Sequence, residues 1–188
     1  MMAIVRKPRS PIDERLRIRI DRTHSPVLAT GVPWASIMLL SLAPFAPLVV
    51  SAPVMPPLAF MALLAWRLMR PGLFPVWAGA PLGAFDDLYS GQPFGAAILL
   101  WSAAMIGLEY IDTRLRWRAF GQDWALAAGL IAGYLLLAAL IANATGGATP
   151  LSVVGPQVLL ALATYPAVTW LVALLDRLRL IPIRELDR

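Results

Sequence analysis

Two adjacent carboxylates, Asp86 and Asp87, interrupt a strongly apolar part of the chain, and no basic residue lies near them in sequence. Charged side chains at membrane depth are costly, so this pair indicates a proton or cation site, a polar anchor for a partner, or a cap at a helix end. Successive residues of a helix point about 100° apart, so at most one carboxylate faces a given neighbour. We expect a structural or partner-binding role ahead of ion transport.

The residue inventory argues against an enzyme. The chain has no Cys and a single His, His24, which excludes thiolate nucleophiles and metal sites built from several His or Cys. A serine nucleophile would lack a His base within the apolar segments, and the only Lys, Lys7, does not follow a phosphate-binding glycine loop. We therefore expect no catalytic residues, no cofactor and no metal.

The composition predicts an all-α, polytopic integral membrane protein. Only 14% of the 188 residues are charged and 59% are hydrophobic, whereas soluble domains carry about 25% charged residues. Residues 23–66 and 124–175 contain no Asp, Glu, Lys or Arg. Runs of this length suit helices, because a helix satisfies its own backbone hydrogen bonds in lipid.

Pro, Gly and charged residues divide the apolar runs into about six transmembrane helices, several of them short or proline-kinked. We expect the first to begin near Pro33 and to kink or end at Pro44. The second covers only about 18 Å, so it must lie where the membrane is thin or lined by protein. The expected spans are residues 32–50, 58–69, 76–88, 93–111, 124–142 and 156–175.

The basic residues support this division. With the N-terminus in the cytoplasm, the inner segments hold seven, two, three and four Lys or Arg residues, which is all 16, and the outer loops hold none. The net charge of +5 is therefore interpreted as the excess of basic residues that sets the orientation of the chain in the membrane. We expect no nucleic-acid partner. We expect a basic segment (1–31), a transmembrane domain (32–175) and a basic tail (176–188), with both ends cytoplasmic and the carboxylate pair near the outer face.

Glycines spaced four apart indicate close helix packing. Gly79 and Gly83 form one pair, Gly129 and Gly133 form another, and each pair lets a neighbouring backbone approach. Contacts between spans of the same chain are favoured over a dimer or partner interface. Asp87 continues the first glycine face at i+4, so we expect Asp87 to point into protein and Asp86 to lie nearer lipid headgroups or water.

Charged and aromatic residues near the span ends are interpreted as interfacial. Arg67 and Arg70 close the second span, and their long side chains can extend to the membrane interface. Most tryptophans, Trp66 among them, lie near span ends and are expected to be interface anchors, whereas Trp101 is deeper and expected to pack. Glu109 and Asp112 lie within reach of two basic residues, Arg114 and Arg116, for an interfacial ion pair.

The central stretch resembles the MreD family of rod shape-determining membrane proteins. It reads Gly-x-x-x-Gly-x-x-Asp-Asp-Leu-Tyr-Ser-Gly-x-Pro-x-Gly, and size and expected topology are similar over nearly the whole chain. The basic N-terminal segment and the proline-rich first hairpin lie outside the pattern. The matching residues, expected to be structural or partner-binding, are Gly79, Gly83, Asp87 (or Asp86), Leu88, Gly91, Pro93 and Gly95.

The resemblance implies a non-enzymatic scaffold of the bacterial inner membrane, acting in cell elongation and peptidoglycan synthesis. Such a scaffold would bind an MreC-like partner, and through it an MreB filament and a peptidoglycan transpeptidase with its glycosyltransferase. The family's fold is similar to the substrate-binding subunits of energy-coupling-factor transporters. The alternative is therefore a small-molecule-binding membrane subunit of a transporter, with Asp86 or Asp87 contacting a ligand in an outward cavity.

Overall fold

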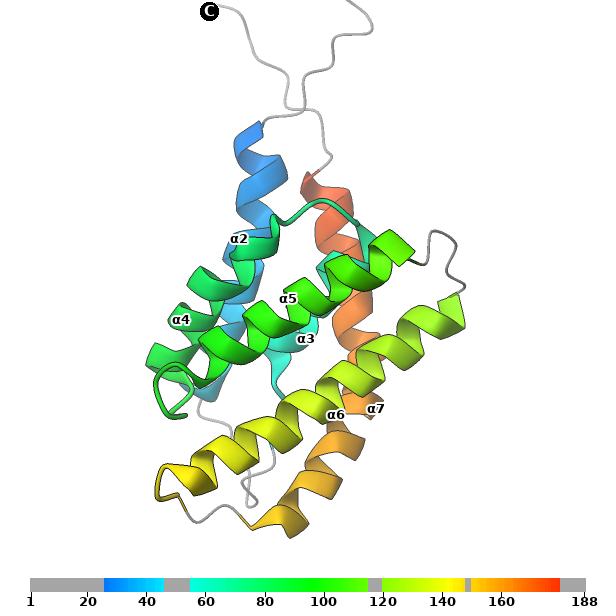
Figure 1. The fold of residues 1–188 in the computed structure, drawn as a ribbon. Coiled ribbons are helices and arrows are strands. Elements are labelled where there is room, and N and C mark those ends of the chain that lie inside the picture. Colours follow the sequence, from blue (N-terminus) through cyan, green and yellow to red (C-terminus); the bar gives the residue numbers. More distant parts are fainter. Residues whose placement is uncertain (1–25, 46–54, 115–119, 148–149, 180–188) are drawn as a thin grey trace, which may run out of the picture.

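The computed structural model describes residues 26–45, 55–114, 120–147 and 150–179, and within these ranges it holds six α-helices and no strand. The expected all-α fold is confirmed. Consecutive helices run alternately up and down (Figure 1). Their bounds are α2 (Pro26–Ser41), α3 (Leu58–Met69), α4 (Gly79–Tyr89), α5 (Ala96–Arg114), α6 (Phe120–Ala144) and α7 (Leu151–Arg179), with short 3-10 helices η1 (Ala43–Phe45) and η2 (Val76–Ala78).

The bundle has two distinct ends. At one end, called here the terminal end, α2 begins and α7 ends; the opposite end, the turn end, holds the α4–α5 turn and the α6–α7 loop (Figure 1). All basic residues of the described ranges lie near the C-terminal ends of α3, α5 and α7, which point to the terminal end. These basic residues are Arg67, Arg70, Arg114, Arg177 and Arg179.

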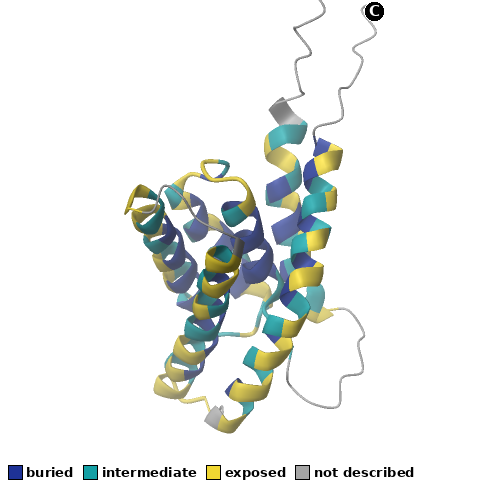
Figure 2. Cartoon of the chain, turned by 90° about the vertical axis from the view of Figure 1, so that its right-hand side faces the viewer, coloured by how far each residue is buried: buried dark blue, intermediate teal, exposed yellow. Residues whose placement is uncertain are grey.

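The short helix α3 lies at the centre of the bundle. Every residue from Ala59 to Arg67 is buried, and α3 packs against α2, α6 and α7. A helix that is apolar on all sides belongs in such a position. Buried residues gather where helices face one another, and exposed residues line the outward faces (Figure 2). The short second span is thus lined by protein.

Three long helices are apolar enough to cross a membrane by length and composition: Ala96–Arg114, Gly121–Ala144 and Ser152–Arg179. Large apolar side chains such as Leu137 on α6 and Leu159 on α7 are exposed. Lipid is the solvent in which such exposure carries no hydrophobic penalty. The described structure therefore agrees with an integral membrane protein.

The first helix differs from the expectation. Pro33 lies inside α2, which begins at Pro26 and ends at Ser41, so a helix starting near Pro33 is wrong. Proline lacks an N–H and leaves the carbonyl four residues earlier without its helical donor. That carbonyl belongs to Ala29, and the Arg179 guanidinium donates to it at 3.0 Å. The donor from α7 explains why proline is tolerated here.

The expected terminal segments fall largely outside the described residues. Residues 1–25 and 180–188 are not described. The helices extend past the expected domain limits, because α2 begins at Pro26 and α7 continues to Arg179. The basic segment and the basic tail stay predictions.

Candidate functional site

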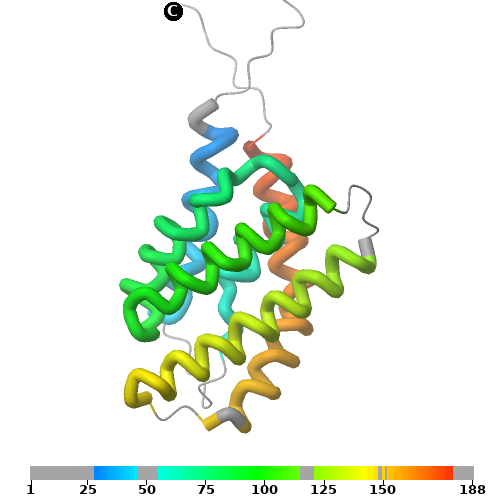
Figure 3. Tube along the Cα trace, in the orientation of Figure 1, coloured from blue at the N-terminus to red at the C-terminus, as the bar shows by residue number. Residues whose placement is uncertain are grey.

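The tightest packing in the described structure joins α4 to α5, which run side by side (Figure 3). A Cβ added at Gly79 would lie 2.7 Å from the carbonyl oxygen of Trp101, and one added at Gly83 would lie 2.6 Å from that of Ala97. Neither distance is possible for a real side chain, so both positions require glycine. The first glycine pair therefore packs within the chain.

Asp87 completes the same face of α4 and caps α5. Its Oδ1 accepts from the Ala97 N–H at 2.8 Å, and its Oδ2 accepts from the N–H groups of Gly95 and Ile98 at 2.9 and 3.2 Å. These donors belong to the start of a helix, where N–H groups lack internal partners and attract negative charge. Asp87 thus points into the protein, as the glycine spacing predicts.

The turn between α4 and α5 depends on two glycines. Gly91 and Gly95 have positive φ values of 69° and 99°, a region that side chains disfavour. The Ser90 N–H donates to the Asp86 carbonyl at 2.8 Å and closes α4, and the Ala96 N–H donates to the Pro93 carbonyl at 3.0 Å as α5 begins. The turn therefore brings the first N–H groups of α5 back to the Asp87 carboxylate.

Asp86 lies elsewhere than expected. It is 7% exposed and lines a cavity of about 230 Å³, together with Trp101 and Tyr134. The expected position near headgroups or water is wrong. The reason is that α4 packs against α2 as well as α5, so the face beside Asp87 also turns into the bundle.

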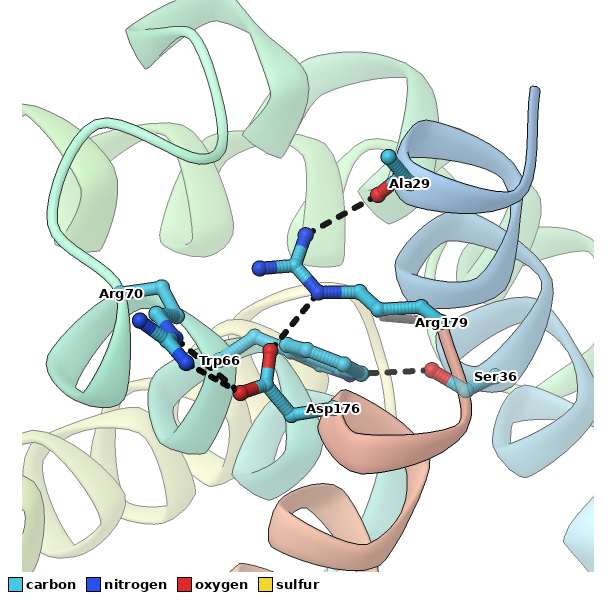
Figure 4. Close-up of polar contacts among 6 residues, drawn as sticks. All are labelled: Ala29, Ser36, Trp66, Arg70, Asp176 and Arg179. Atoms are coloured by element: carbon cyan, nitrogen blue, oxygen red, sulfur yellow. Dashed lines mark hydrogen bonds and ion pairs between the residues drawn. The ribbon is translucent and has the colours of Figure 1, made fainter. Parts of the chain in front are cut away.

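A second polar cluster joins three helices at the terminal end (Figure 4). The Asp176 carboxylate accepts from Arg70 at 2.7 and 3.1 Å and from Arg179 at 2.7 Å. The Arg179 guanidinium lies 5.5 Å above the Trp66 ring, and the Trp66 indole N–H donates to Ser36 Oγ at 3.0 Å. Hydrogen bonding to Asp176 raises the pKa of the Arg70 guanidinium. The cluster fixes α2, α3 and α7 together.

Arg67 makes the corresponding link from α3 to α5. Its Nη2 lies 2.5 Å from Glu109 Oε2 and 3.0 Å from Asp112 Oδ2, and its side chain is buried. The expected extension of Arg67 to the interface is therefore wrong, because its buried side chain pairs with carboxylates of α5. Arg70 pairs with Asp176 but is exposed, so its interfacial position stays a prediction. The interfacial position expected for Trp66 is also wrong, since its ring is fully buried, whereas the packing expected for Trp101 is confirmed.

Comparison with known proteins places this arrangement in a family. The family model "rod shape-determining protein MreD" matches residues 28–178, which covers all six described helices except the first residues of α2 and the last of α7. The chain belongs to the MreD family. No curated protein and no solved structure matches it, so the likeness to energy-coupling-factor subunits stays a prediction. As an MreD-family member, the chain is a rod shape-determining membrane protein.

The second glycine pair of this MreD-family chain is not packed against a neighbour in the described residues. A Cβ at Gly129 or Gly133 would meet nothing within 4 Å, and Gly129 is exposed. The expected contact with another span of the same chain is therefore not formed there. The packing role predicted for this pair stays a prediction.

The polar groups at both ends act as structural ties. Among the described residues, no three His, Cys, Asp or Glu side chains come together to hold a metal ion. The carboxylates of Asp87, Glu109, Asp112 and Asp176 are all engaged by backbone N–H groups or arginines. These ties do not use Asp86, which lines the cavity instead.

Proposed function

We propose that this chain is a non-enzymatic scaffold of the bacterial cell-elongation complex in the inner membrane. It would bind an MreC-like partner, and through it an MreB filament and a peptidoglycan transpeptidase with its glycosyltransferase. The observation that carries the proposal is the α4–α5 hairpin, in which Gly79, Gly83 and Asp87 fix one helix against the backbone of the other. A surface held in place before binding loses less entropy when a partner docks.

Exposed apolar side chains cover the turn end of this hairpin. Leu88 at the end of α4 is 65% exposed, Phe94 in the turn is 72% exposed and Leu99 on α5 is 61% exposed. We call these residues the hairpin surface and propose it as the partner contact. Phe94 is the proposed anchor, because aromatic residues, Phe included, are enriched in protein interfaces.

The proposed orientation places both chain ends in the cytoplasm. The arginines at the C-terminal ends of α3, α5 and α7 gather at the terminal end, and excess basic charge is typical of the cytoplasmic side. The hairpin surface would then lie at the outer side of the membrane. A reporter enzyme fused after Arg188 should be active only in the cytoplasm, and activity of that fusion outside the cytoplasm would contradict this orientation.

Co-purification tests the partner role. The full-length chain would be purified in mild detergent with its bound proteins, as wild type and as Leu88→Ser and Phe94→Ser. We expect both variants to lose most of the MreC-like partner, because they shorten exposed side chains without touching the contacts beneath. Leu159→Ser is the matched control, since Leu159 is 70% exposed but lies on α7. Full partner recovery with both hairpin variants would contradict the proposal.

The cavity beside Asp86 supports a second candidate, a small-molecule-binding membrane subunit of a transporter. Buried polar groups in a cavity are typical of ligand sites. The same purification separates the two candidates. A scaffold should co-purify with proteins of cell-wall synthesis, whereas a transporter subunit should co-purify with transport ATPases.

A further inference from the structure

The cavity at the turn end is large enough for an organic group. It measures about 230 Å³ and lies among the end of α2, the start of α3, the end of α4 and the middle of α6. A single water molecule needs only about 10–15 Å³ of such space. Its polar lining includes Asp86, Ser90, Gln92 and Tyr134.

The cavity contains a buried negative charge without a positive partner. Asp86 is 7% exposed and forms no ion pair with any residue of the described ranges. The arginines of those ranges lie at the terminal end of the bundle. A carboxylate removed from water requires a cation or good hydrogen-bond donors. The Ser41 hydroxyl at the end of α2 also lines the cavity and can donate to Asp86. A hydroxyl does not neutralise a charge, and no basic side chain of the described helices reaches Asp86, so a bound cation would complement it.

One wall of the cavity is aromatic. Phe60 stacks on Tyr134 with ring centroids 4.4 Å apart and an interplanar angle of 20°, and it lies 5.8 Å from the Trp101 ring. Aromatic faces attract organic cations through their quadrupole. They give no oxygen ligand to a metal ion. The stacked faces of Phe60 and Tyr134 cover each other, so only the remaining ring surface meets the cavity. That surface, together with a volume far above that of one metal ion, favours an organic cation.

The remaining polar atoms select the kind of organic cation. Gln92 Nε2 donates to Tyr134 Oη at 3.3 Å, and this leaves Gln92 Oε1 buried without a hydrogen bond within the described structure. Ser90 Oγ is also buried without a partner there. With the Asp86 carboxylate, the cavity thus offers three acceptor groups against one buried donor without a hydrogen bond there on α5, the Trp101 indole N–H. A primary ammonium group carries three N–H donors, whereas a quaternary ammonium group carries none.

We propose that this cavity binds a primary ammonium group, with Asp86 as its counter-ion and Gln92 and Ser90 as further acceptors. The group belongs either to a phospholipid with an ethanolamine headgroup or to a soluble amine. This site goes beyond the scaffold role and does not depend on it, because binding is measured on the isolated chain without any partner.

Two measurements on the purified full-length chain distinguish the sources. The first is the change in melting temperature on adding ethanolamine or choline, at constant salt. The second is native mass spectrometry of the chain taken from nanodiscs that contain phosphatidylethanolamine or phosphatidylcholine. A lipid site should retain phosphatidylethanolamine and respond weakly to free ethanolamine, whereas a soluble-amine site should respond to free ethanolamine and retain neither lipid.

Asp86→Asn and Asp87→Asn form a matched pair, because each removes one carboxylate charge from the same helix. Asp86→Asn should weaken binding of the responding amine by about ten- to a hundredfold, with the melting temperature of the free chain maintained or raised. Asp87→Asn should lower the melting temperature, since it weakens the cap of α5, but should keep amine binding. The Tyr134→Phe variant should keep most of the affinity for the amine.

Several outcomes would overturn the proposal. The first is that ethanolamine causes no change in melting temperature and no phosphatidylethanolamine is retained. The second is that wild type and Asp86→Asn bind the amine equally. The third is that choline and ethanolamine bind equally. A stabilisation by Na⁺ or Mg²⁺ that is lost in Asp86→Asn, without any amine binding, would assign the cavity to a metal ion and would also overturn it.

Discussion

The Asp87 carboxylate accepts a hydrogen bond from the Ala97 N–H at 2.8 Å, while the carbonyl of that same Ala97 lies against Gly83. One face of α4 thus accepts a hydrogen bond from the N–H of Ala97 and packs closely against the carbonyl of the same residue. Such a contact fixes the register of the two helices, because sliding by a single residue would break the hydrogen bond and press a larger side chain against the backbone. The hairpin surface is supported by this contact.

Gly83→Ala should destabilise the chain. Its Cβ would lie 2.6 Å from a backbone oxygen of α5, so the helices must separate, and overpacking of this kind costs about 1–3 kcal/mol. Gly129→Ala is the matched control, because its Cβ meets nothing within 4 Å. Detergent titration of the folded protein measures both changes. Equal stability of the two variants would argue against the close contact.

Asp87→Ala should also destabilise the chain, because it removes the acceptor for the N–H groups of Gly95, Ala97 and Ile98. Loss of a charged helix cap costs about 2–3 kcal/mol. Asp86→Ala, at the neighbouring position, should have no comparable cost because it removes a carboxylate without an ion-pair partner. Hydrogen exchange at the start of α5 should rise only in Asp87→Ala. Unchanged exchange there would contradict the cap.

Arg67→Met should lower the free energy of unfolding by about 1–2 kcal/mol, because the charge-assisted contacts to Glu109 and Asp112 are lost while both carboxylates keep access to solvent. Arg114→Met is the control, since its exposed guanidinium contacts only the Tyr110 ring, at 5.3 Å, among the described residues. Adding Glu109→Gln to Arg67→Met should recover part of the loss. Absence of any coupling in this double-mutant cycle would show that the ion pair is unimportant.

Pro33 and Arg179 should be energetically coupled. Pro33→Ala restores an N–H that can reach the Ala29 carbonyl, which Arg179 serves in the wild type. Arg179→Lys should therefore destabilise the wild-type background more than the Pro33→Ala background, by about 1 kcal/mol. Detergent titration of the four proteins in the cycle gives this difference. Strict additivity would contradict the assigned role of Arg179.

Local pattern was sufficient to predict much of the helical framework. The residues expected for the second span coincide with α3, Leu58–Met69, because Pro57 and the Pro71-Gly72 breaker bound an unbroken apolar run. The i+4 spacing from Gly83 to Asp87 also predicted which carboxylate points into protein. Both results depend on helical periodicity, which the sequence carries directly.

Contacts between distant segments could not be predicted in this way. Arg67 and Glu109 are 42 positions apart, and nothing in sequence links them. One signal was available, since an arginine in a helix that is apolar on all sides requires a buried partner. Pro33 was a second signal, because a proline inside a helix implies an external donor for the carbonyl it leaves. The inward position of Asp86 had no such signal, as it follows from packing of α4 between α2 and α5.

Site-specific photo-crosslinking in living cells tests the scaffold role most directly. A photoreactive residue would replace Phe94 of the hairpin surface or, as the control, Leu159 of α7, which are 72% and 70% exposed. The proposed role predicts a crosslink to an MreC-like protein from position 94 and none from position 159. No crosslink from position 94 in cells that keep their rod shape, or equal crosslinking from both positions, would contradict it.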